Sequence, residues 1–364
     1  MKIAFDHYAF TMQSVGGISR YFISLADQFV KLNSDFKIFA GYSDNSYLDK
    51  ISREFCDFKK APYFPNRVRF IFSIINELEN RRKIRDWQPN ILHQTYYSSY
   101  RKKVLCAKVI TVHDMIHEIF KSDFKFNDST AKNKKISIEN ADHIIAISNN
   151  TKNDLVSLLN VNPSKISVIY HGVDKRIFSR PEILKNINVP YILYVGSRGG
   201  YKNFSTLLIA CSISKKIKNN IKIIAFGGGF FTSSEKLLIK NLGFTDGIVE
   251  NRFGDDNDLS NFYSNATCFV YPSLYEGFGL PLLEAMVCGC PVISSNSSSM
   301  PEVVNGAGIL FDPHSPDSLS HAIEKMLFDS EARREYINLG YKNSDLFSWE
   351  KTSAATLDLY KKLC

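Results

Sequence analysis

The segment 271–304 constrains the fold of this chain more than any other part of its sequence. The apolar run Cys268–Tyr271 predicts a buried strand, and a glycine-containing loop follows it. Pro281 is typical of the first turn of a helix, and Gly289 is typical of the residue just past a helix end. The pattern therefore predicts a strand, a glycine loop and a helix in immediate succession, as in an α/β unit.

The glycine loop predicts a binding site for a ligand that carries both phosphate and hydroxyl groups. Glycine allows the backbone to approach a ligand closely, and the N–H groups of Phe278, Gly279 and Leu280 at a helix N-terminus favour an anion. We place Glu284 in the first turn of this helix, eight positions after Glu276. Two carboxylates beside a phosphate are explained if each accepts hydrogen bonds from sugar or ribose hydroxyls of the same ligand.

The run from Glu276 to Ala285, Glu-Gly-Phe-Gly-Leu-Pro-Leu-Leu-Glu-Ala, resembles the signature of the retaining family 4 glycosyltransferases. The resemblance implies the GT-B fold, an α/β architecture of two Rossmann-like domains that face a central cleft. It also implies a C-terminal helix that crosses back to the first domain. The alternative is an ordinary strand–helix unit in which one glutamate caps the helix, since two glutamates at this spacing also occur by chance.

Length and composition agree with two domains and exclude some classes of protein. A chain of 364 residues exceeds the usual single-domain size, and its aliphatic runs alternate with helical patterns. No apolar run reaches the roughly eighteen residues that cross a membrane, and the N-terminus lacks the pattern of a signal peptide, so we expect a cytoplasmic protein. The net charge of +8 suits an anionic nucleotide, an anionic membrane or nucleic acid. Seven scattered cysteines, with Cys288 and Cys290 as the only close pair, are interpreted as small buried residues.

Two positions in the first half of the chain are candidates for contact with the ligand. The pair Gly16-Gly17 precedes a helical pattern after the first strand, where open α/β sheets bind phosphates. His113 follows the apolar strand Val109–Val112, at the carboxyl end where such sheets place ligand-binding groups. The family resemblance implies that the glycine loop meets the donor phosphate and that His113 contacts the donor sugar. A plain turn and a structural histidine are the alternatives, and a metal site at His113 with His117 lacks a convincing third ligand.

The segment 66–87 predicts a basic helix. It carries apolar residues on one face and six cationic side chains: Arg67, Arg69, Arg81, Arg82, Lys83 and Arg85. A solvated helix face is one interpretation, and docking on anionic lipid head groups at the inner face of the cell membrane is the other. The segment has no companion module for nucleic acid, so we expect no nucleic-acid partner.

The domain boundaries follow from the motifs. Residues 171–174, His-Gly-Val-Asp, resemble the element that closes the first domain in the family. We expect an N-terminal acceptor domain at 1–175, a linker at 176–190, a nucleotide-sugar domain at 191–345, and a terminal helix at 346–364 that returns to the first domain.

The second domain begins with another strand, glycine turn and helix, and this one carries two cations. Arg198 and Lys202 suit a pyrophosphate by forked hydrogen bonding and by point charge, and they match an Arg and a Lys of the family. Gly227 follows a further strand, where close backbone approach to a ligand is expected. Arg252 and Phe253 lie in the segment whose backbone reads the nucleotide base in the family.

Two further segments predict helix starts. Asp256-Asn257-Asp258 spells the metal motif of a different glycosyltransferase fold, but it precedes a helical pattern, so we interpret it as helix capping and expect no metal site. Ser299 and Glu302 have the spacing of a capping box.

Together these features predict a retaining, metal-independent glycosyltransferase that uses a nucleotide sugar and needs no further cofactor. The acceptor is expected to be a glycan or a lipid-linked saccharide, and the resemblance to bacterial O-antigen mannosyltransferases favours GDP-mannose. Glu276 would hold sugar hydroxyls, Glu284 the ribose, and closure about the linker would assemble the site. A UDP-hexose or deoxysugar donor and a non-catalytic nucleotide-sugar-binding partner remain as alternatives. A Rossmann oxidoreductase is disfavoured because the dinucleotide fingerprint is absent from the sequence.

Overall fold

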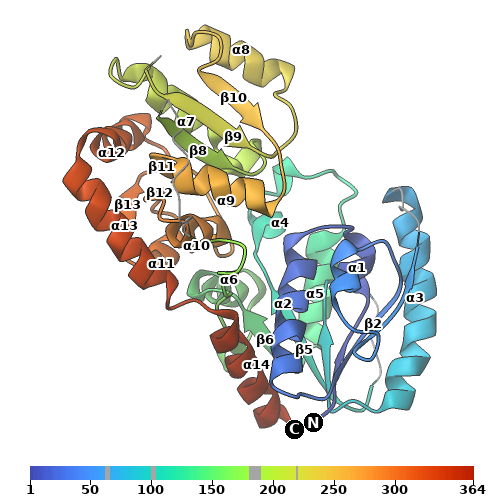
Figure 1. Cartoon of the computed structure of the whole chain (residues 1–364). Helices are drawn as coiled ribbons and strands as arrows, with labels where there is room; N and C mark the ends of the chain where they lie inside the picture. Colours follow the sequence, from blue (N-terminus) through green and yellow to red (C-terminus); the bar gives the residue numbers. More distant parts are fainter. Residues whose placement is uncertain (62–65, 100–103, 180–189, 219) are drawn as a thin grey trace. The chain divides into compact units, whose positions relative to one another are not determined.

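The computed structural model describes residues 1–61, 66–99, 104–179, 190–218 and 220–364. The chain divides into two compact units, one formed by Met1–Gly172 with Trp349–Cys364 and the other by Val173–Ser348. Both are α/β units with a parallel sheet (Figure 1). The expected linker at 176–190 lies for the most part outside the described residues.

The first unit contains a parallel seven-stranded sheet in the order β3-β2-β1-β4-β5-β6-β7. Its strands are β1 (Ile3–Phe5), β2 (Phe36–Ser43), β3 (Cys56–Lys60), β4 (Ile91–Gln94), β5 (Ala107–Val112), β6 (His143–Ala146) and β7 (Ile166–Val168). The main helices are α1 (Tyr8–Met12), α2 (Gly17–Lys31), α3 (Asn66–Trp87), α4 (Ile116–Ile119), α5 (Thr130–Asn140), α6 (Asn149–Leu159) and α14 (Trp349–Leu363). The strand order reverses between the neighbouring strands β1 and β4. From β1 the chain continues to β2 at one edge of the sheet, and from β4 it continues to β5 toward the other edge.

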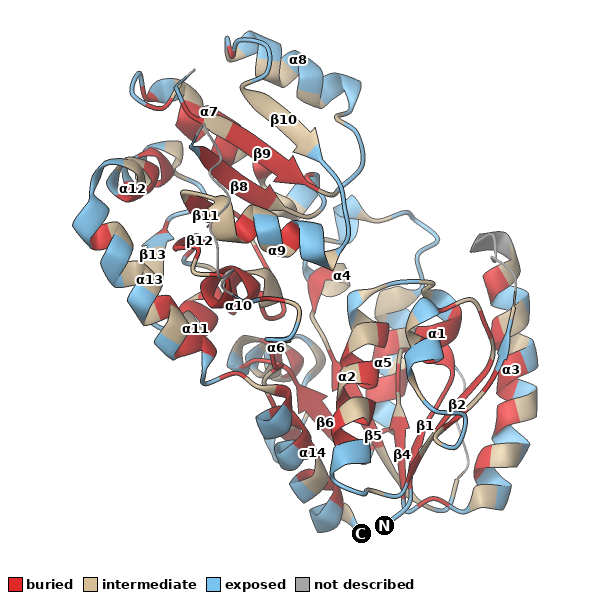
Figure 2. Cartoon of the chain, viewed as in Figure 1, coloured by how far each residue is buried: buried red, intermediate tan, exposed pale blue. Residues whose placement is uncertain are grey.

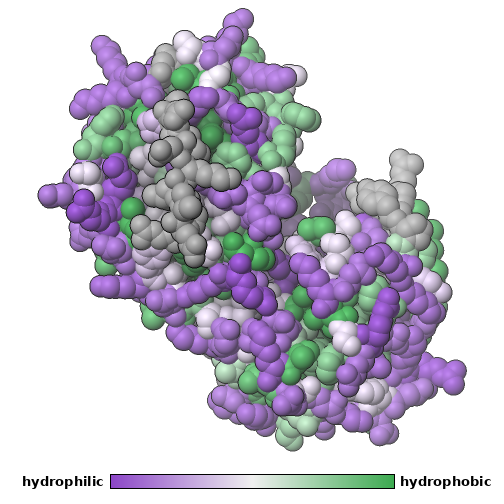
Figure 3. All heavy atoms as spheres, in the orientation of Figure 1, coloured by the Kyte–Doolittle hydropathy of each residue, from purple (hydrophilic) through white to green (hydrophobic). Residues whose placement is uncertain are grey.

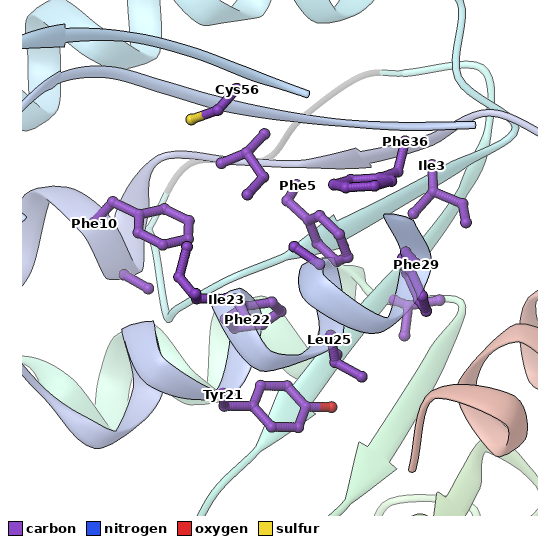
Figure 4. Close-up of a cluster of buried hydrophobic side chains, with 14 of the residues drawn as sticks. Ile3, Phe5, Phe10, Tyr21, Phe22, Ile23, Leu25, Phe29, Phe36 and Cys56 are labelled. Carbon is purple, nitrogen blue, oxygen red and sulfur yellow. The ribbon is translucent and has the colours of Figure 1, made fainter. Parts of the chain in front are cut away.

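The core of the first unit is rich in aromatic rings, which fill the layer between α2 and the strands β1 and β2. Phe5 packs edge-on against Phe22 at 5.5 Å and stacks on Phe29 at 6.1 Å between ring centroids. Figure 4 shows these rings between α2 and the strands, and Figure 2 shows that the central strands of this sheet are largely buried. Buried aromatic rings of this size dominate the energetics of a core.

The C-terminal helix α14 packs on the first unit, as the family resemblance implies. The hydroxyl of Tyr360 hydrogen-bonds to Nδ1 of the buried His93, and its ring meets Phe29 edge-on at 6.4 Å. Trp349, at the start of α14, lies 5.9 Å from the ring of Tyr21. The last residues of the chain therefore complete the core that its first residues begin.

The second unit contains a parallel six-stranded sheet in the order β10-β9-β8-β11-β12-β13. Its strands are β8 (Tyr191–Val195), β9 (Lys222–Phe226), β10 (Val249–Arg252), β11 (Cys268–Tyr271), β12 (Val292–Ser295) and β13 (Gly308–Phe311). Its helices are α7 (Phe204–Ile213), α8 (Ser233–Asn241), α9 (Asp256–Asn265), α10 (Leu280–Val287), α11 (Met300–Val304), α12 (Pro316–Phe328) and α13 (Ser330–Ser344). Here the strand order reverses between β8 and β11.

Helix α3 has the predicted bounds but a different orientation. Its apolar side chains Ile75 and Leu78 are exposed, whereas Asn76 and Asn80 are buried. The reason lies in β2, where a register irregularity between Phe39 and Gly41 leaves backbone groups outside the strand ladder. The side-chain amides of α3 pair with those groups: Asn76 donates to Tyr42 O and accepts from Tyr42 N, and Asn80 donates to Phe39 O.

Candidate active site

The site residues of the second unit lie where its strand order reverses. In open α/β sheets, ligands bind outside the carboxyl ends of the strands at such a point. The turn after β8 ends with Lys202, and the loop after β11 carries Glu276. Lys202 Nζ lies 2.7 Å from Glu276 Oε1, so the two predicted residues form a hydrogen-bonded ion pair. Both side chains retain a small exposed fraction, 18% for Lys202 and 10% for Glu276, so the pair is accessible from one side.

Two serines that precede α11 hold the Glu276 loop. Ser298 Oγ accepts from Glu276 N at 2.9 Å, and Ser299 Oγ donates to the carbonyls of Glu276 and Phe278, at 2.8 Å each. The predicted capping box at Ser299 and Glu302 is wrong, because Ser299 makes no side-chain cap to α11. Its hydroxyl is already engaged with the loop, which the spacing of the sequence does not reveal.

Gly279 forms the sharp turn into α10. Its φ of +108° is in the region that disfavours residues with a side chain, and an added Cβ would lie 3.0 Å from Leu282 Cδ1. Leu280 is the first helical residue, Pro281 follows it in the first turn as predicted, and Phe278 is buried against Phe347 at 5.9 Å. The loop thus presents backbone N–H groups at a helix N-terminus.

The position of Glu284 differs from the prediction. Helix α10 begins at Leu280, so Glu284 lies beyond its first turn, which contains no acidic residue. The carboxylate is buried and accepts a hydrogen bond from Tyr263 Oη at 3.4 Å. Burial, and then the charge of Glu284, hold the pKa of Tyr263 well above its usual range, so this tyrosine stays a neutral donor.

Arg198 is engaged with the glycine loop that follows β9. Its Nη1 donates to Gly227 O at 2.8 Å, and its Nη2 donates to Gly229 O and Phe230 O at 2.9 and 3.0 Å. Its Nε donates to Glu235 at 2.7 Å. Burial raises the pKa of Glu235, but the hydrogen bonds from Arg198 and Thr232 and the charge of Arg198 together outweigh this and hold the pKa below its usual value. The guanidinium therefore fixes the conformation of residues 227–230.

Gly227, Gly228 and Gly229 all have positive φ values, which explains the run of three glycines at the end of β9. Arg252, in β10, is exposed and pairs with Glu250. Phe253 is exposed as well and meets Phe230 edge-on at 5.1 Å between ring centroids. These two rings lie at the carboxyl ends of β9 and β10, next to the glycine loop.

The first unit holds Gly16 and Gly17 at the N-terminus of α2. The short helix α1, which the sequence analysis did not predict, separates them from β1. An added Cβ at Gly16 would lie 2.3 Å from Gln13 Oε1, whereas at Gly17 it would meet no atom within 4 Å. The absence of a side chain at Gly17 thus leaves open space beside the first turn of α2.

His113 lies directly after β5, and its ring is held among aromatic neighbours. It stacks on His171 at 5.8 Å and meets Tyr21 edge-on at 5.3 Å, while its backbone N donates to Tyr97 Oη at 3.3 Å. Burial, with the nearby His93 and Lys134, lowers the pKa of His113 to about 3, so the ring is neutral at pH 7. Its Nε2 is buried and has no hydrogen-bond partner among the described residues. A buried polar atom of this kind is expected to find its partner in a ligand or water.

The described residues contain no group of three or more His, Cys, Asp or Glu side chains placed to hold a metal ion. The Asp-x-Asp segment starts α9, as predicted: Asp255 is the N-cap and Asp258 completes a capping box with it.

Two family models match consecutive parts of the chain. A model described as "Glycosyltransferase Family 4" matches residues 15–176, and one described as "Glycosyl transferases group 1" matches residues 175–343. Among curated proteins, the chain is 28% identical to O-antigen chain mannosyltransferase B of Escherichia coli, covering 95% of this chain and 96% of that protein. It is 26% identical to O-antigen chain mannosyltransferase RfbU of Salmonella typhimurium, over 74% of this chain and 80% of the relative.

Solved structures with the same fold include sucrose-phosphate synthase from Thermosynechococcus elongatus, with a TM-score of 0.81 at 22% identity over 100% of this chain and 98% of the other. WaaG, a glycosyltransferase involved in lipopolysaccharide biosynthesis, matches with a TM-score of 0.71 at 15% identity over 98% and 99% of the two chains. The two parallel sheets, the family models and these relatives agree that the chain belongs to family 4 of the glycosyltransferases and has the GT-B fold.

Proposed function

We propose that this protein is a retaining glycosyltransferase that moves a hexose from a nucleotide sugar to a saccharide acceptor without a metal ion. The observation that carries the proposal is the Lys202–Glu276 ion pair, at the strand-order reversal of the second unit and beside the helix N-terminus at Gly279. A cation next to a carboxylate suits a ligand that carries both a diphosphate, which the cation binds, and sugar hydroxyls, which donate to the carboxylate.

The reaction requires that negative charge on the departing diphosphate be stabilised while the sugar develops oxocarbenium-like character. We assign that stabilisation to Lys202 and to the N–H groups at Phe278, Gly279 and Leu280, with Gly16 and Gly17 meeting the phosphate from the first unit. Glu276 accepts hydrogen bonds from the sugar, and Glu284 is assigned to the ribose. Attack occurs on the face from which the diphosphate leaves, and the leaving phosphate takes the acceptor proton.

His113 is assigned to the donor sugar. Its neutral ring at pH 7 and its buried Nε2 without a protein partner support this role. A neutral imidazole can donate to or accept from a sugar hydroxyl without adding a positive charge next to the developing oxocarbenium ion.

Arg198 acts on the donor through the glycine loop that it holds. Gly227, Gly228 and Gly229 adopt left-handed backbone conformations, and the guanidinium pairs with the carbonyls of Gly227, Gly229 and Phe230. Phe253, beside that loop, is a candidate platform for the nucleotide base, with Arg252 near it.

GDP-mannose is the donor we favour, because two of the curated relatives, one of them matching 95% of this chain, are named as O-antigen mannosyltransferases. For such a donor, the acceptor we propose is a glycan or lipid-linked glycan of bacterial surface polysaccharide. Some solved structures with this fold contain UDP or UDP-glucose, which keeps a UDP-sugar donor as the alternative.

Helix α3 supports contact with an anionic membrane during this reaction. Its outer surface combines exposed Phe70, Ile71, Ile75 and Leu78 with the exposed arginines 81, 82 and 85, and Figure 3 shows both green and purple atoms where Figure 1 draws α3. Apolar side chains flanked by cations are typical of helices that lie in the membrane interface. Arg69 and Lys83 do not belong to this surface, because Arg69 is buried against Asp44 and Lys83 is paired with Asp57 and Glu79. Among the described residues, no helix is long and apolar enough to span a membrane.

The test uses GDP-mannose, UDP-glucose, UDP-N-acetylglucosamine and a dTDP-deoxysugar, each with EDTA and a panel of alkyl glycosides. Release of nucleoside diphosphate identifies the donor, and proton NMR of the product gives the anomeric configuration. We expect turnover of one donor, unaffected by EDTA, with retention at the anomeric carbon. Inversion, a requirement for metal, or no turnover of any donor would contradict the proposal.

Membrane docking is tested by flotation with vesicles of phosphatidylglycerol and phosphatidylethanolamine. Leu78→Ser is expected to reduce binding several-fold, because it removes apolar area from the docking surface. The matched control is Leu237→Ser, which changes another exposed leucine, in the second unit. Equal binding of both variants would locate the docking surface elsewhere.

A further inference from the structure

Lys134 is a buried lysine to which the proposed reaction assigns no role. It lies in the middle of α5, and none of its side chain is exposed. Lysine is almost never fully buried unless it is paired, because removing an ammonium group from water is costly. The next residue, Lys135, is exposed to solvent. Lys134 therefore needs partners inside the first unit that compensate its charge.

The partners of Lys134 belong to the segment that directly follows His113. Its Nζ donates to Asp114 O at 2.8 Å and to Glu118 Oε2 at 2.7 Å, and Asp114 Oδ1 lies 3.6 Å away. Glu118 is nearly buried as well, with 9% of its side chain exposed. The ammonium group thus joins α5 both to the loop at Asp114 and to the short helix α4, which contains Glu118.

The same ammonium group lies over the ring of Tyr97, 5.2 Å from the ring centroid. The hydroxyl of Tyr97 is the group that accepts the hydrogen bond from His113 N. His113 is therefore held from two directions. Its own N–H bonds to Tyr97, and the carbonyl of the following residue, Asp114, bonds to Lys134.

Regular secondary structure does little to fix this segment. The strand ladder of β5 extends only to Val112, which pairs with Ala146 of β6, and α4 is a helix of four residues without a side-chain cap. The position of His113 between them depends on side-chain hydrogen bonds, and Lys134 contributes two of these bonds. A buried ion pair is not needed for stability alone, because apolar side chains of similar volume often stabilise a fold equally well.

We propose that Lys134 is a positioning residue for the transfer reaction, and that its hydrogen bond to Asp114 O holds His113 at the donor sugar. Glu118 compensates the charge and orients the ammonium group toward the loop. A shift of the loop would displace His113 Nε2, the buried atom that has no partner among the described residues. The proposal rests on the proposed function for the role of His113, whereas the anchoring of its ring does not depend on any substrate.

The test compares wild type with Lys134→Met/Glu118→Met, which removes both charges and keeps side chains of similar length. NMR of protein labelled at histidine Cε1 reports the environment of the His113 ring, and a His113→Asn variant identifies the signal. In wild type the signal should carry the ring-current shift of a ring edge-on to Tyr21, and in the double variant it should move toward that of an exposed histidine. The kcat should fall about ten- to a hundredfold, because a misplacement of about 1 Å has such a cost, whereas KM for the donor should change less than about threefold.

Lys135→Met is the matched control, because it makes the same change at an exposed position of α5. Its His113 signal and its kcat should equal those of wild type. Lys134→Gln is a second variant: its amide can donate to Glu118, but it is one atom shorter than lysine and cannot bond Asp114 O at the same time. It should show the same displaced signal and reduced kcat, and it decides the proposal if thermal unfolding shows that the double variant is not folded.

The proposal is supported if folded Lys134 variants show both a displaced His113 signal and a reduced kcat. It is overturned if the signal keeps its wild-type position, if kcat is unchanged although the signal moves, or if Lys135→Met causes the same changes. Absence of turnover by wild type with every donor would contradict the proposed function instead. The NMR comparison would then decide by itself whether Lys134 anchors His113.

Discussion

The two units hold their candidate site residues in different electrostatic states. In the second unit the cations Arg198 and Lys202 are each paired with a glutamate, within a framework of glycines that have positive φ. In the first unit the corresponding residue, His113, is neutral, because burial strongly lowers its pKa. Under the proposed function, this difference assigns the cations that stabilise the diphosphate to the second unit and the neutral contact with the donor sugar to the first.

The largest effect expected from this comparison is that of Lys202→Ala. The substitution removes a charge-assisted contact to the diphosphate and leaves Glu276 without its cation. Such contacts contribute about 1.5–3 kcal/mol, so kcat/KM for the donor should fall about a hundredfold. Steady-state kinetics measure this, with Lys240→Ala on the exposed face of α8 as the control. A loss below threefold would mean that Lys202 is not at the diphosphate.

Arg198→Ala sharpens the distinction between a residue that contacts the donor and one that holds the site. Because the guanidinium is buried and paired with Glu235 and three carbonyls, its loss should destabilise the second unit by about 2–4 kcal/mol. The Tm should fall by several degrees, more than for Lys202→Ala, and activity should fall at least tenfold. Calorimetry of both variants checks this. An unchanged Tm would show that the glycine loop does not depend on Arg198.

The neutral histidines of the first unit predict how stability depends on pH. Burial lowers the pKa of both His93 and His113 to about 3, below the ordinary value of about 6.5 that an unfolded chain has. The unfolded state therefore binds protons first as pH falls, and the free energy of unfolding decreases between pH 6.5 and pH 3. The slope is about 1.4 kcal/mol per pH unit for each histidine.

Urea unfolding at pH 7.5, 6.0 and 5.0 measures this slope. The double variant His93→Gln/His113→Asn should show a shallower pH dependence than wild type, whereas His321→Asn, at an exposed position of α12, should not change it. Identical slopes in all three proteins would indicate that these histidines are not neutral in the folded unit.

Gly17→Ala should have the smallest effect on the fold. The added Cβ meets no atom within 4 Å, so the Tm should change by less than about 2 °C. Gly16→Ala, whose Cβ would meet the Gln13 side chain, should lower the Tm more. If the donor phosphate approaches α2 here, Gly17→Ala reduces kcat/KM several-fold in a folded protein. An unchanged kcat/KM would show that the N-terminus of α2 does not contact the donor phosphate.

Much of the second unit could be predicted from sequence because its constraints are local. The strand Cys268–Tyr271, the positive φ at Gly279 and Gly289, and Pro281 in the first turn all follow from neighbouring residues. Lys202 and Glu276, identified by family resemblance, are brought together because they follow the adjacent strands β8 and β11.

The predictions that failed depend on partners far away in sequence. Ser299 has the spacing of a capping box, yet its hydroxyl bonds the loop carbonyls more than twenty residues earlier. Helix α3 buries the face whose side-chain amides pair with backbone groups of β2. The helical pattern of the sequence does not reveal these partners. Lys134 could not be identified from sequence, because lysines 132, 134 and 135 look alike there and only the structure shows which of them is buried.

The central claim is that the Lys202–Glu276 pair binds a nucleotide sugar. The most direct measurement is the release of nucleoside diphosphate from GDP-mannose and UDP-glucose, with EDTA present, by wild type, Glu276→Ala and the control Glu331→Ala. We predict turnover of one donor by wild type and by Glu331→Ala, with a loss of about a hundredfold in Glu276→Ala at unchanged Tm. Equal turnover by wild type and Glu276→Ala would contradict the claim, because the loop around which the second unit is built would then have no part in the reaction.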